Sequence, residues 1–456
     1  MKRIALITLT VALSVISGPA QSTALTLQDA VQQALDRYPA VRSSVEQVSA
    51  AAAAIGLART TYLPRADMLL QENRATHNNV FGLTLPQSIL PQISGPALGT
   101  NSLSSVWGSA VGTLVTWEPF DFGLRKANVG IAEVERDRAQ AQVNVTKLQV
   151  GTAAADGFLT ILAAQETVVA ARSAVDRARV LNQTVQVLVN NQLRPGADAA
   201  RTRAELALAE AQLIRAEQSV DVSKAALAQL LGVTGQSIST QPGPLLQVPP
   251  TDMVPAFDPV HHPQAIAQIQ AVYVVRAREE ALERSYHPRF YLQGTTYARG
   301  TGLRPNGTVG GEFSGAYPNT QNWGLGLAVT FPIFDIASIR ARKRIENFNE
   351  RAATAKYDQT VQDLNGQMEQ ARATLAAARR ITQTTPIQLE AARTTEQQAS
   401  ARYKSGLGNI VEVAEAERIL AQAEIDDALA RLGVWRALLG VAAGGGDLQP
   451  FLNEAK

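Results

Sequence analysis

Apolar residues recur every three or four positions through most of the chain, which is the spacing of one face of an α-helix. The longest such runs cover about 126–190 and 338–404. Each is followed, after a turn, by a shorter helical run, at about 198–231 and 410–439. A helix of about 65 residues is about 100 Å long. Helices of this length do not fit inside a globular domain, so they are predicted to form a coiled-coil wall.

The apolar residues of these helices follow the three-and-four spacing of a coiled coil. Off the seam, further apolar residues of the last helix include Ile425, Leu429 and Leu432. Two apolar stripes on one helix indicate neighbours on two sides, as in a closed barrel of helices. Pro386 interrupts the second long run and predicts a local kink there. The seam residues are Val361, Leu364, Met368, Ala371, Leu375 and Ala378 in one helix, and Leu206, Ala209, Leu213, Ala216, Val220, Ser223, Leu227 and Leu230 in another.

Four shorter segments alternate apolar and polar residues, which predicts β-strands. They lie at about 65–77, 106–120, 289–299 and 322–334. An apolar face opposite a small or polar face matches a lipid-facing strand of an outer-membrane barrel, and also a half-buried soluble strand. Four strands cannot close a barrel, so three copies with twelve strands are expected. The predicted lipid-facing residues of the last strand are Trp323, Leu325, Leu327, Val329 and Phe331.

The same order of elements occurs twice. The sequences YLPR (62–65) and YHPR (286–289) each join a helix to a strand, and Phe-Asp follows the second and the fourth strand. LLGV ends both shorter helices. These repeated motifs indicate an internal duplication in an α+β protein. The predicted organisation is a first repeat at 25–231, a Pro-rich connector at 232–258, a second repeat at 259–441 and a flexible tail at 442–456.

The N-terminal residues have the pattern of a secretory signal. Lys2 and Arg3 precede the apolar run 4–16, and residues 22–24 form a small-x-small cleavage site. We therefore assign residues 1–24 to a signal peptide. No later run of about 18 apolar residues is present, which predicts no transmembrane helix. A membrane-spanning form would then be a β-barrel.

Composition narrows the chemistry. The net charge is +2, which gives no indication of nucleic-acid binding. The chain has no cysteine, which excludes disulfides, thiol catalysis and an N-terminal lipidated cysteine. The four histidines lack the spacing of a zinc site, and no phosphate loop or nucleophile motif is present. We expect no enzyme, no cofactor and no metal.

Taken together, these features make the mature chain resemble the TolC-like outer-membrane efflux proteins. The resemblance rests on the signal peptide, both Tyr-x-Pro repeats, both Phe-Asp strand ends, both hairpin turns and the Pro-rich connector. It implies a homotrimer in the outer membrane of a Gram-negative bacterium, with a twelve-stranded barrel in the lipid and a helical barrel crossing the periplasm. It also implies two partners, a periplasmic adaptor (membrane fusion protein) and an inner-membrane pump. The chain is then a passive exit duct for tripartite efflux or type I secretion.

The second hairpin turn, ARYKSGLGNIVEVAEAE, resembles the family stretch whose two acidic residues constrict the pore. Glu412 and Glu415 take those places, and Tyr403 matches a gate-lining tyrosine. Residues three apart share a face of a helix, so three copies would make two stacked acidic rings. This chain has Glu where the best-known pattern has Asp. The alternative is a pair of acids on a solvated helix face.

The two turns also resemble the sites where the adaptor's helical hairpin docks, although each is in any case a turn between helices. The competing function is a secreted trimeric coiled-coil interaction protein without a pore. The sequence does not identify the exported substrate, the pump or the adaptor. The predicted docking residues are Leu193, Arg194, Pro195, Gly196, Gly406, Leu407, Gly408 and Asn409.

Overall fold

The computed structural model describes residues 24–76, 103–235, 238–249, 257–304, 306 and 308–456. The predicted signal peptide, except for its last residue, lies outside the described residues, as does most of the segment 78–105 between the first two predicted strands. The elements come in the predicted order. The first repeat contains α1 (Leu27–Arg37), α2 (Pro39–Thr60), β1 (Arg65–Thr76), β2 (Ser105–Phe120), α3 (Leu124–Asn190) and α4 (Gly196–Leu231).

The second repeat follows a connector with two short 3-10 turns, η1 (Gly243–Leu246) and η2 (Pro259–His261). Its elements correspond to those of the first repeat, with one helix in place of the α1–α2 pair and one added at the end. They are α5 (Pro263–Arg284), β3 (Arg289–Thr301), β4 (Thr320–Thr330), α6 (Ile336–Lys404), α7 (Ile410–Gly445) and α8 (Gln449–Glu454).

Two prolines have different effects on the helices. Pro39 starts α2, at the first helical position, where its missing N–H costs no hydrogen bond. One helix ends at Arg37 and the next begins at Pro39. Pro386 lies inside α6, which continues through it. A kink at Pro386 stays a prediction.

The contacts divide the chain into two compact units, each drawn from both repeats. One unit contains α1, α4, α7, α8 and the parts of α3 and α6 from Thr146 and Leu364 onward. The other contains the four strands, α5, most of α2 and the earlier parts of α3 and α6.

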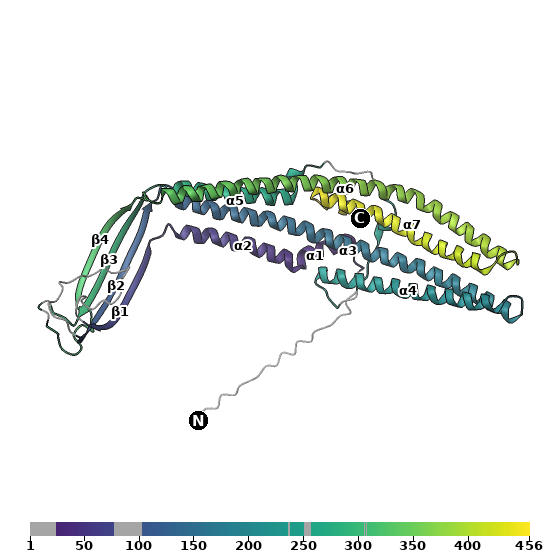
Figure 1. Cartoon of the computed structure of the whole chain (residues 1–456), viewed down its shortest axis with the longest axis horizontal. Coiled ribbons are helices and arrows are strands. Elements are labelled where there is room, and N and C mark those ends of the chain that lie inside the picture. Colours follow the sequence, from purple (N-terminus) through teal and green to yellow (C-terminus); the bar gives the residue numbers. More distant parts are fainter. Residues whose placement is uncertain (1–23, 77–102, 236–237, 250–256, 305, 307) are drawn as a thin grey trace, which may run out of the picture. The chain divides into compact units, whose positions relative to one another are not determined.

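The strands form one antiparallel sheet in the order β1-β2-β3-β4, and they run side by side in Figure 1. β1 pairs with β2 from Arg65↔Thr116 to Thr76↔Ser105, and β3 pairs with β4 from Arg289↔Thr330 to Arg299↔Thr320. Within the described part of the chain, β1 and β4 each pair on one side only. Unpaired edges of 12 and 11 residues are ready to accept further strands.

The predicted outward face of β4 is exposed in the single chain. Trp323, Leu325 and Leu327 are 82%, 73% and 68% exposed, and Val329 and Phe331 are also exposed. Large apolar side chains left open to solvent indicate a surface that meets lipid or protein.

The helical unit has one large hydrophobic core cluster and two smaller ones, and Leu227, Met368 and Leu375 of the predicted seams lie in the large one. Leu364, Met368 and Leu375 of α6 are at most 2% exposed, and Leu227 of α4 is fully buried. In Figure 1, α4 runs beside the later part of α3, and α7 beside the later part of α6. The predicted coiled-coil packing is therefore confirmed for these seams.

The C-terminal tail corrects one prediction. Residues 442–456 were expected to be flexible, but α7 continues to Gly445 and α8 follows. Phe451 and Leu452 of α8 are buried in the core, and the Phe451 ring lies edge-on to Trp435 with centroids 6.2 Å apart. Two large apolar residues buried in this way hold a segment that has no helical periodicity of its own.

The hydropathy of α3 also differs from expectation. An 18-residue window of this helix, with a mean hydropathy of 1.3, is long and apolar enough to cross a membrane by composition alone. No transmembrane helix was expected from the sequence. In the helical unit α3 places Phe158, Leu159 and Ile161 in the buried core, and a core helix passes the same test.

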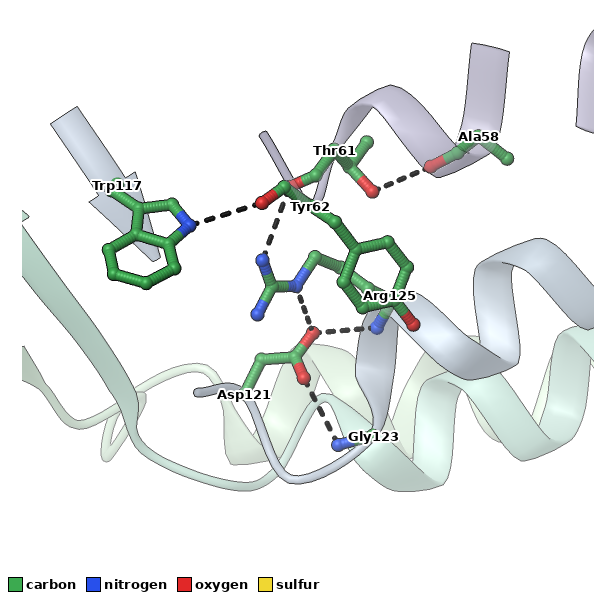
Figure 2. Close-up of polar contacts among 7 residues, drawn as sticks. All are labelled: Ala58, Thr61, Tyr62, Trp117, Asp121, Gly123 and Arg125. Carbon is green, nitrogen blue, oxygen red and sulfur yellow. Dashed lines mark hydrogen bonds and ion pairs between the residues drawn. The ribbon is translucent and has the colours of Figure 1, made fainter. Parts of the chain in front are cut away.

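The junction of β2 and α3 explains why the Tyr-x-Pro-Arg and Phe-Asp motifs occur together in the first repeat (Figure 2). The Asp121 carboxylate accepts hydrogen bonds from the Arg125 N–H at 2.7 Å and from Arg125 Nε at 2.9 Å. Arg125 Nη1 donates to the Thr61 carbonyl at 3.2 Å, and the guanidinium lies 4.8 Å from the centre of the Tyr62 ring. Trp117 Nε1 donates to the Tyr62 carbonyl at 3.1 Å. The turn after α2 is thereby tied to the start of α3.

Asp121 is buried, and its ionised form is stabilised by these bonds. Burial raises the pKa of this carboxyl. The hydrogen bonds from Arg125 and Gly123 and the charge of Arg125 lower the pKa by more than burial raises it, so the net pKa lies below its usual value. In the second repeat the fourth residue after Asp335 is Ile339, not arginine. The Asp335 side chain makes no ion pair with a described residue, so the two junctions are chemically different.

Candidate functional site

The turn between α3 and α4 is closed by backbone hydrogen bonds. The Leu193 N–H donates to the Leu188 carbonyl at 2.9 Å, and Gln192 has a positive φ of 60°. Pro195 is the residue before the first turn of α4, which begins at Gly196. The Leu193 side chain is 68% exposed. The predicted docking residues of this turn therefore present one apolar side chain to solvent.

The turn between α6 and α7 depends on two glycines and a cap. Gly406 has a φ of 80°, in the left-handed region that favours glycine. A Cβ on Gly408 would lie 3.2 Å from Arg402 Cβ and from the Tyr403 backbone N, a tight contact that glycine avoids. The Asn409 side chain accepts from the Glu412 N–H at 3.0 Å and starts α7. The Leu407 side chain, at 74% exposure, lies at this tip.

Glu412 and Glu415 lie on the exposed side of the first turns of α7, so the expected shared face is present. Each has a basic neighbour. Glu412 accepts from Asn409 Nδ2 at 3.0 Å and lies 3.9 Å from Arg402 Nε. Glu415 accepts from Arg418 at 2.6 Å and 3.0 Å, and this hydrogen bond holds the pKa of Glu415 below its usual value.

Tyr403 is buried, unlike these two glutamates. It was expected to line the gate, but its side chain is 2% exposed and packs among Val185, Ala199 and Val413. Its hydroxyl donates to Asp198 Oδ2 at 3.1 Å. The difference has a physical reason, because an aromatic ring at this point of α6 fills the space against α3, α4 and α7 instead of facing solvent.

Arg194 completes this contact between the two tips. Its Nη2 donates to the Tyr403 carbonyl at 2.7 Å, and its guanidinium lies 4.4 Å from the centre of the Tyr403 ring. Burial and the negative charge of Asp198 raise the pKa of Tyr403, and Arg194 partly opposes them. The hydroxyl therefore remains a donor at neutral pH, and the arrangement holds the α3–α4 turn to the end of α6.

A charged cluster lies further along α7. Arg177 of α3 donates to both carboxylate oxygens of Glu424, at 3.0 Å and 3.2 Å. Burial raises the pKa of Glu417 to about 7, and the charges of Glu396 and Glu205 raise it while Arg177 lowers it. Glu417 is therefore partly protonated at neutral pH.

The sequence indicated the candidate residues of this site better than it indicated the side chains that pair with them. Arg418 is three residues after Glu415 on one helix, a spacing that could have revealed the pair. Asp198 and Tyr403 are 205 residues apart, and no local pattern connects them. Among the described residues, no group of three or more histidine, aspartate or glutamate side chains could hold a metal ion.

Comparison with known proteins places these features in one family. The family model for outer membrane efflux protein matches residues 30–233 and 271–443. Nodulation protein T of Rhizobium leguminosarum bv. trifolii is 22% identical over 429 residues, which are 91% of this chain and 85% of that protein.

Two solved structures share the fold. The CmeC outer membrane channel of Campylobacter jejuni gives a TM-score of 0.72 at 16% identity and covers 94% of this chain and 89% of its own. The MtrE outer membrane channel of Neisseria gonorrhoeae gives 0.70 at 19% identity and covers 93% and 90%. The fold is that of an outer-membrane channel in which a helical barrel is joined to a strand barrel.

Proposed function

Because this chain belongs to the outer membrane efflux protein family, we propose that it is the passive exit duct of a tripartite efflux or type I secretion system. It is an outer-membrane channel that extends into the periplasm. The observation that carries the proposed role in an export system is the pair of tight hairpin tips. One tip has acidic residues, and both have an exposed leucine. Membership of this family argues against the competing idea of a secreted coiled coil without a pore.

The channel is proposed to be a homotrimer. Its support is the four-stranded sheet with unpaired edges β1 and β4, because three such sheets would close a twelve-stranded barrel. The exposed row from Trp323 to Phe331 on β4 is proposed to face the lipid. Helices with exposed valines and isoleucines, such as Ile214 of α4 and Ile387 of α6, leave further apolar surface for the neighbouring copies.

Glu412 and Glu415 are proposed to form two rings that constrict the duct at its periplasmic end. Both are exposed in the single chain, and both come directly after the turn. Arg402 and Arg418 reduce the net charge of these rings. These two arginines were not part of the expectation from the sequence. In the assembled rings, like charges from three copies would oppose the lowering of the Glu415 pKa. Tyr403 contributes by holding the tips together and does not face the pore.

The exposed tips are proposed to receive the hairpin of a periplasmic adaptor, through which an inner-membrane pump supplies the energy. The support is the exposure of Leu193 and Leu407 at two adjacent turns whose backbones are fixed by their own hydrogen bonds. The two leucines lie at adjacent tips, and apolar side chains gathered on one exposed surface mark interaction sites.

The proposed duct is tested by reconstituting the purified chain in planar bilayers. Discrete single-channel currents that depend on the concentration of added protein are expected. A protein that inserts without producing current in any bilayer tested would contradict the duct.

A further inference from the structure

The junction between β4 and α6 carries a cluster of basic residues. Between Asp335 and Glu346 the chain has Arg340, Arg342, Lys343 and Arg344 and no acidic residue. Lys343 pairs with Glu283 and Glu279. Among the described residues, the other three make no ion pair. Such a cluster next to a membrane-facing element indicates an anionic partner.

Arg289 adds a further cation from the start of β3. In the first repeat, the corresponding Arg65 is paired with Asp67 at 2.9 Å. The residue two after Arg289 is Tyr291, not an acid, and no described residue pairs with the Arg289 side chain. The second repeat has therefore kept the arginine of the motif and lacks the carboxylate that neutralises it in the first.

Arg289 and Arg342 line the same pocket, which has a volume of about 410 Å³. This lies in the range of about 300–1,000 Å³ that is usual for ligand sites. The wall includes the hydroxyl-bearing Ser285 and Ser338, the exposed apolar Phe331, and Asp335, the one carboxylate among the lining residues. The two guanidinium groups outnumber this carboxylate.

The apolar surface beside the pocket shows which kind of anion fits. Phe331, Ile333 and Phe334 follow β4 directly and are 62%, 65% and 97% exposed. They continue the exposed face of β4 that is proposed to meet lipid. A molecule with acyl chains and an anionic head would cover the apolar residues and reach the arginines at the same time.

We propose that Arg289 and Arg342 bind the phosphate of an anionic phospholipid in the periplasmic leaflet of the outer membrane. Guanidinium groups match phosphate because their planar forks donate two parallel hydrogen bonds. The site holds the end of the sheet at the level of the lipid headgroups. This inference rests on the proposed lipid-facing surface of β4 and does not depend on the constriction or on the adaptor.

The test uses native mass spectrometry of the purified full chain in detergent with added phosphatidylglycerol. The wild type is expected to retain this lipid, and the Arg289→Gln/Arg342→Gln variant to lose it by about tenfold or more. The matched control is Arg65→Gln, which removes the paired arginine of the first repeat and should retain lipid as the wild type does. Arg289→Lys/Arg342→Lys keeps the charge and should recover most of the binding, which separates lost binding from lost folding.

Two further probes identify the source of the phosphate. Diacylglycerol with the same acyl chains should not be retained, and inorganic phosphate should not displace the lipid at equal concentration. Equal retention of phosphatidylglycerol by the wild type and the glutamine variant would overturn the site. Displacement by inorganic phosphate would overturn a lipid ligand. The conductance of the Arg289→Gln/Arg342→Gln variant in bilayers is expected to equal that of the wild type. Loss of the lipid site and failure of the proposed duct therefore give different results.

Discussion

Glu417 is a residue at which pH should act near neutrality. Its pKa of about 7 in the folded chain is above the ordinary value, so the folded state holds a proton that the unfolded state has lost. The stabilisation is fully present below about pH 4.5 and is lost as pH rises through about 7.

We expect Glu417→Gln to remove this dependence. The variant should be more stable than the wild type at pH 8, by on the order of 1 to 2 kcal/mol after allowance for solvent screening of a half-buried group. At pH 4 the two should unfold alike. Thermal unfolding followed by circular dichroism at both pH values measures the difference. The control is Glu390→Gln on the exposed face of α6, which should shift neither curve.

Tyr403 should act through its hydroxyl as well as its ring. Tyr403→Phe keeps the buried ring but leaves Asp198 without its donor, at a cost of about 1 kcal/mol. Hydrogen exchange of the amides from Lys404 to Ile410 should become faster, because the contact between the two tips is weakened. Tyr403→Ala, which also empties the ring site, should have a larger effect. Unchanged exchange in Tyr403→Phe would show that the bond to Asp198 does not hold the tip.

At the scale of the elements, the long helices and the strands could be predicted closely because their periodicity extends over many residues. α3 and α6 begin within about two residues of the predicted positions, and α6 ends at Lys404 as predicted. α8 could not be predicted in this way, because six residues contain too few turns for a periodic signal. Its order comes from burying Phe451 and Leu452.

The candidate site was predictable in part for the same reason. Glu412 and Glu415 lie on one helix with a defined turn before them, so their shared face follows from local sequence. The burial of Tyr403 depends on α4, which comes from the other repeat, and only the folded chain brings the two together. The pocket of Arg289 and Arg342 likewise needs α5, β3 and α6 at once.

The two strand-to-helix junctions offer a matched pair of variants. Asp121→Asn leaves the buried Arg125 without its counter-charge, which should cost about 3–5 kcal/mol. Asp335→Asn at the equivalent place, where Ile339 replaces the arginine, should change stability by less than about 0.5 kcal/mol. Urea unfolding followed by tryptophan fluorescence compares the two. Equal losses would contradict the role assigned to the Asp121–Arg125 pair.

The lowered pKa of Asp121 also determines the direction in which stability changes with pH. Its contribution is present above the ordinary carboxyl pKa and is lost as pH falls through the lower pKa of the folded chain. The stability of the wild type should therefore decline below about pH 4, and Asp121→Asn should show less of this decline.

For the whole molecule, the open edges of the described sheet support the proposed trimer. β1 and β4 would otherwise expose unpaired backbone groups in the membrane, where each costs several kcal/mol. Native mass spectrometry in detergent is expected to show three subunits, and crosslinking should saturate at three. A stable monomer under these conditions would contradict the twelve-stranded barrel.

The tip of α7 is proposed to close the duct, and the current through a single channel tests this constriction. Trivalent cations added on the periplasmic side should block the wild type, because two rings of carboxylates attract them. Glu412→Ala/Glu415→Ala should lose the block and much of the cation selectivity. The control Glu369→Ala/Glu390→Ala removes two exposed glutamates of α6. This channel should keep both the block by trivalent cations and the cation selectivity. A block of unchanged strength in the Glu412→Ala/Glu415→Ala channel would contradict the account, since these two residues would then not line the pore.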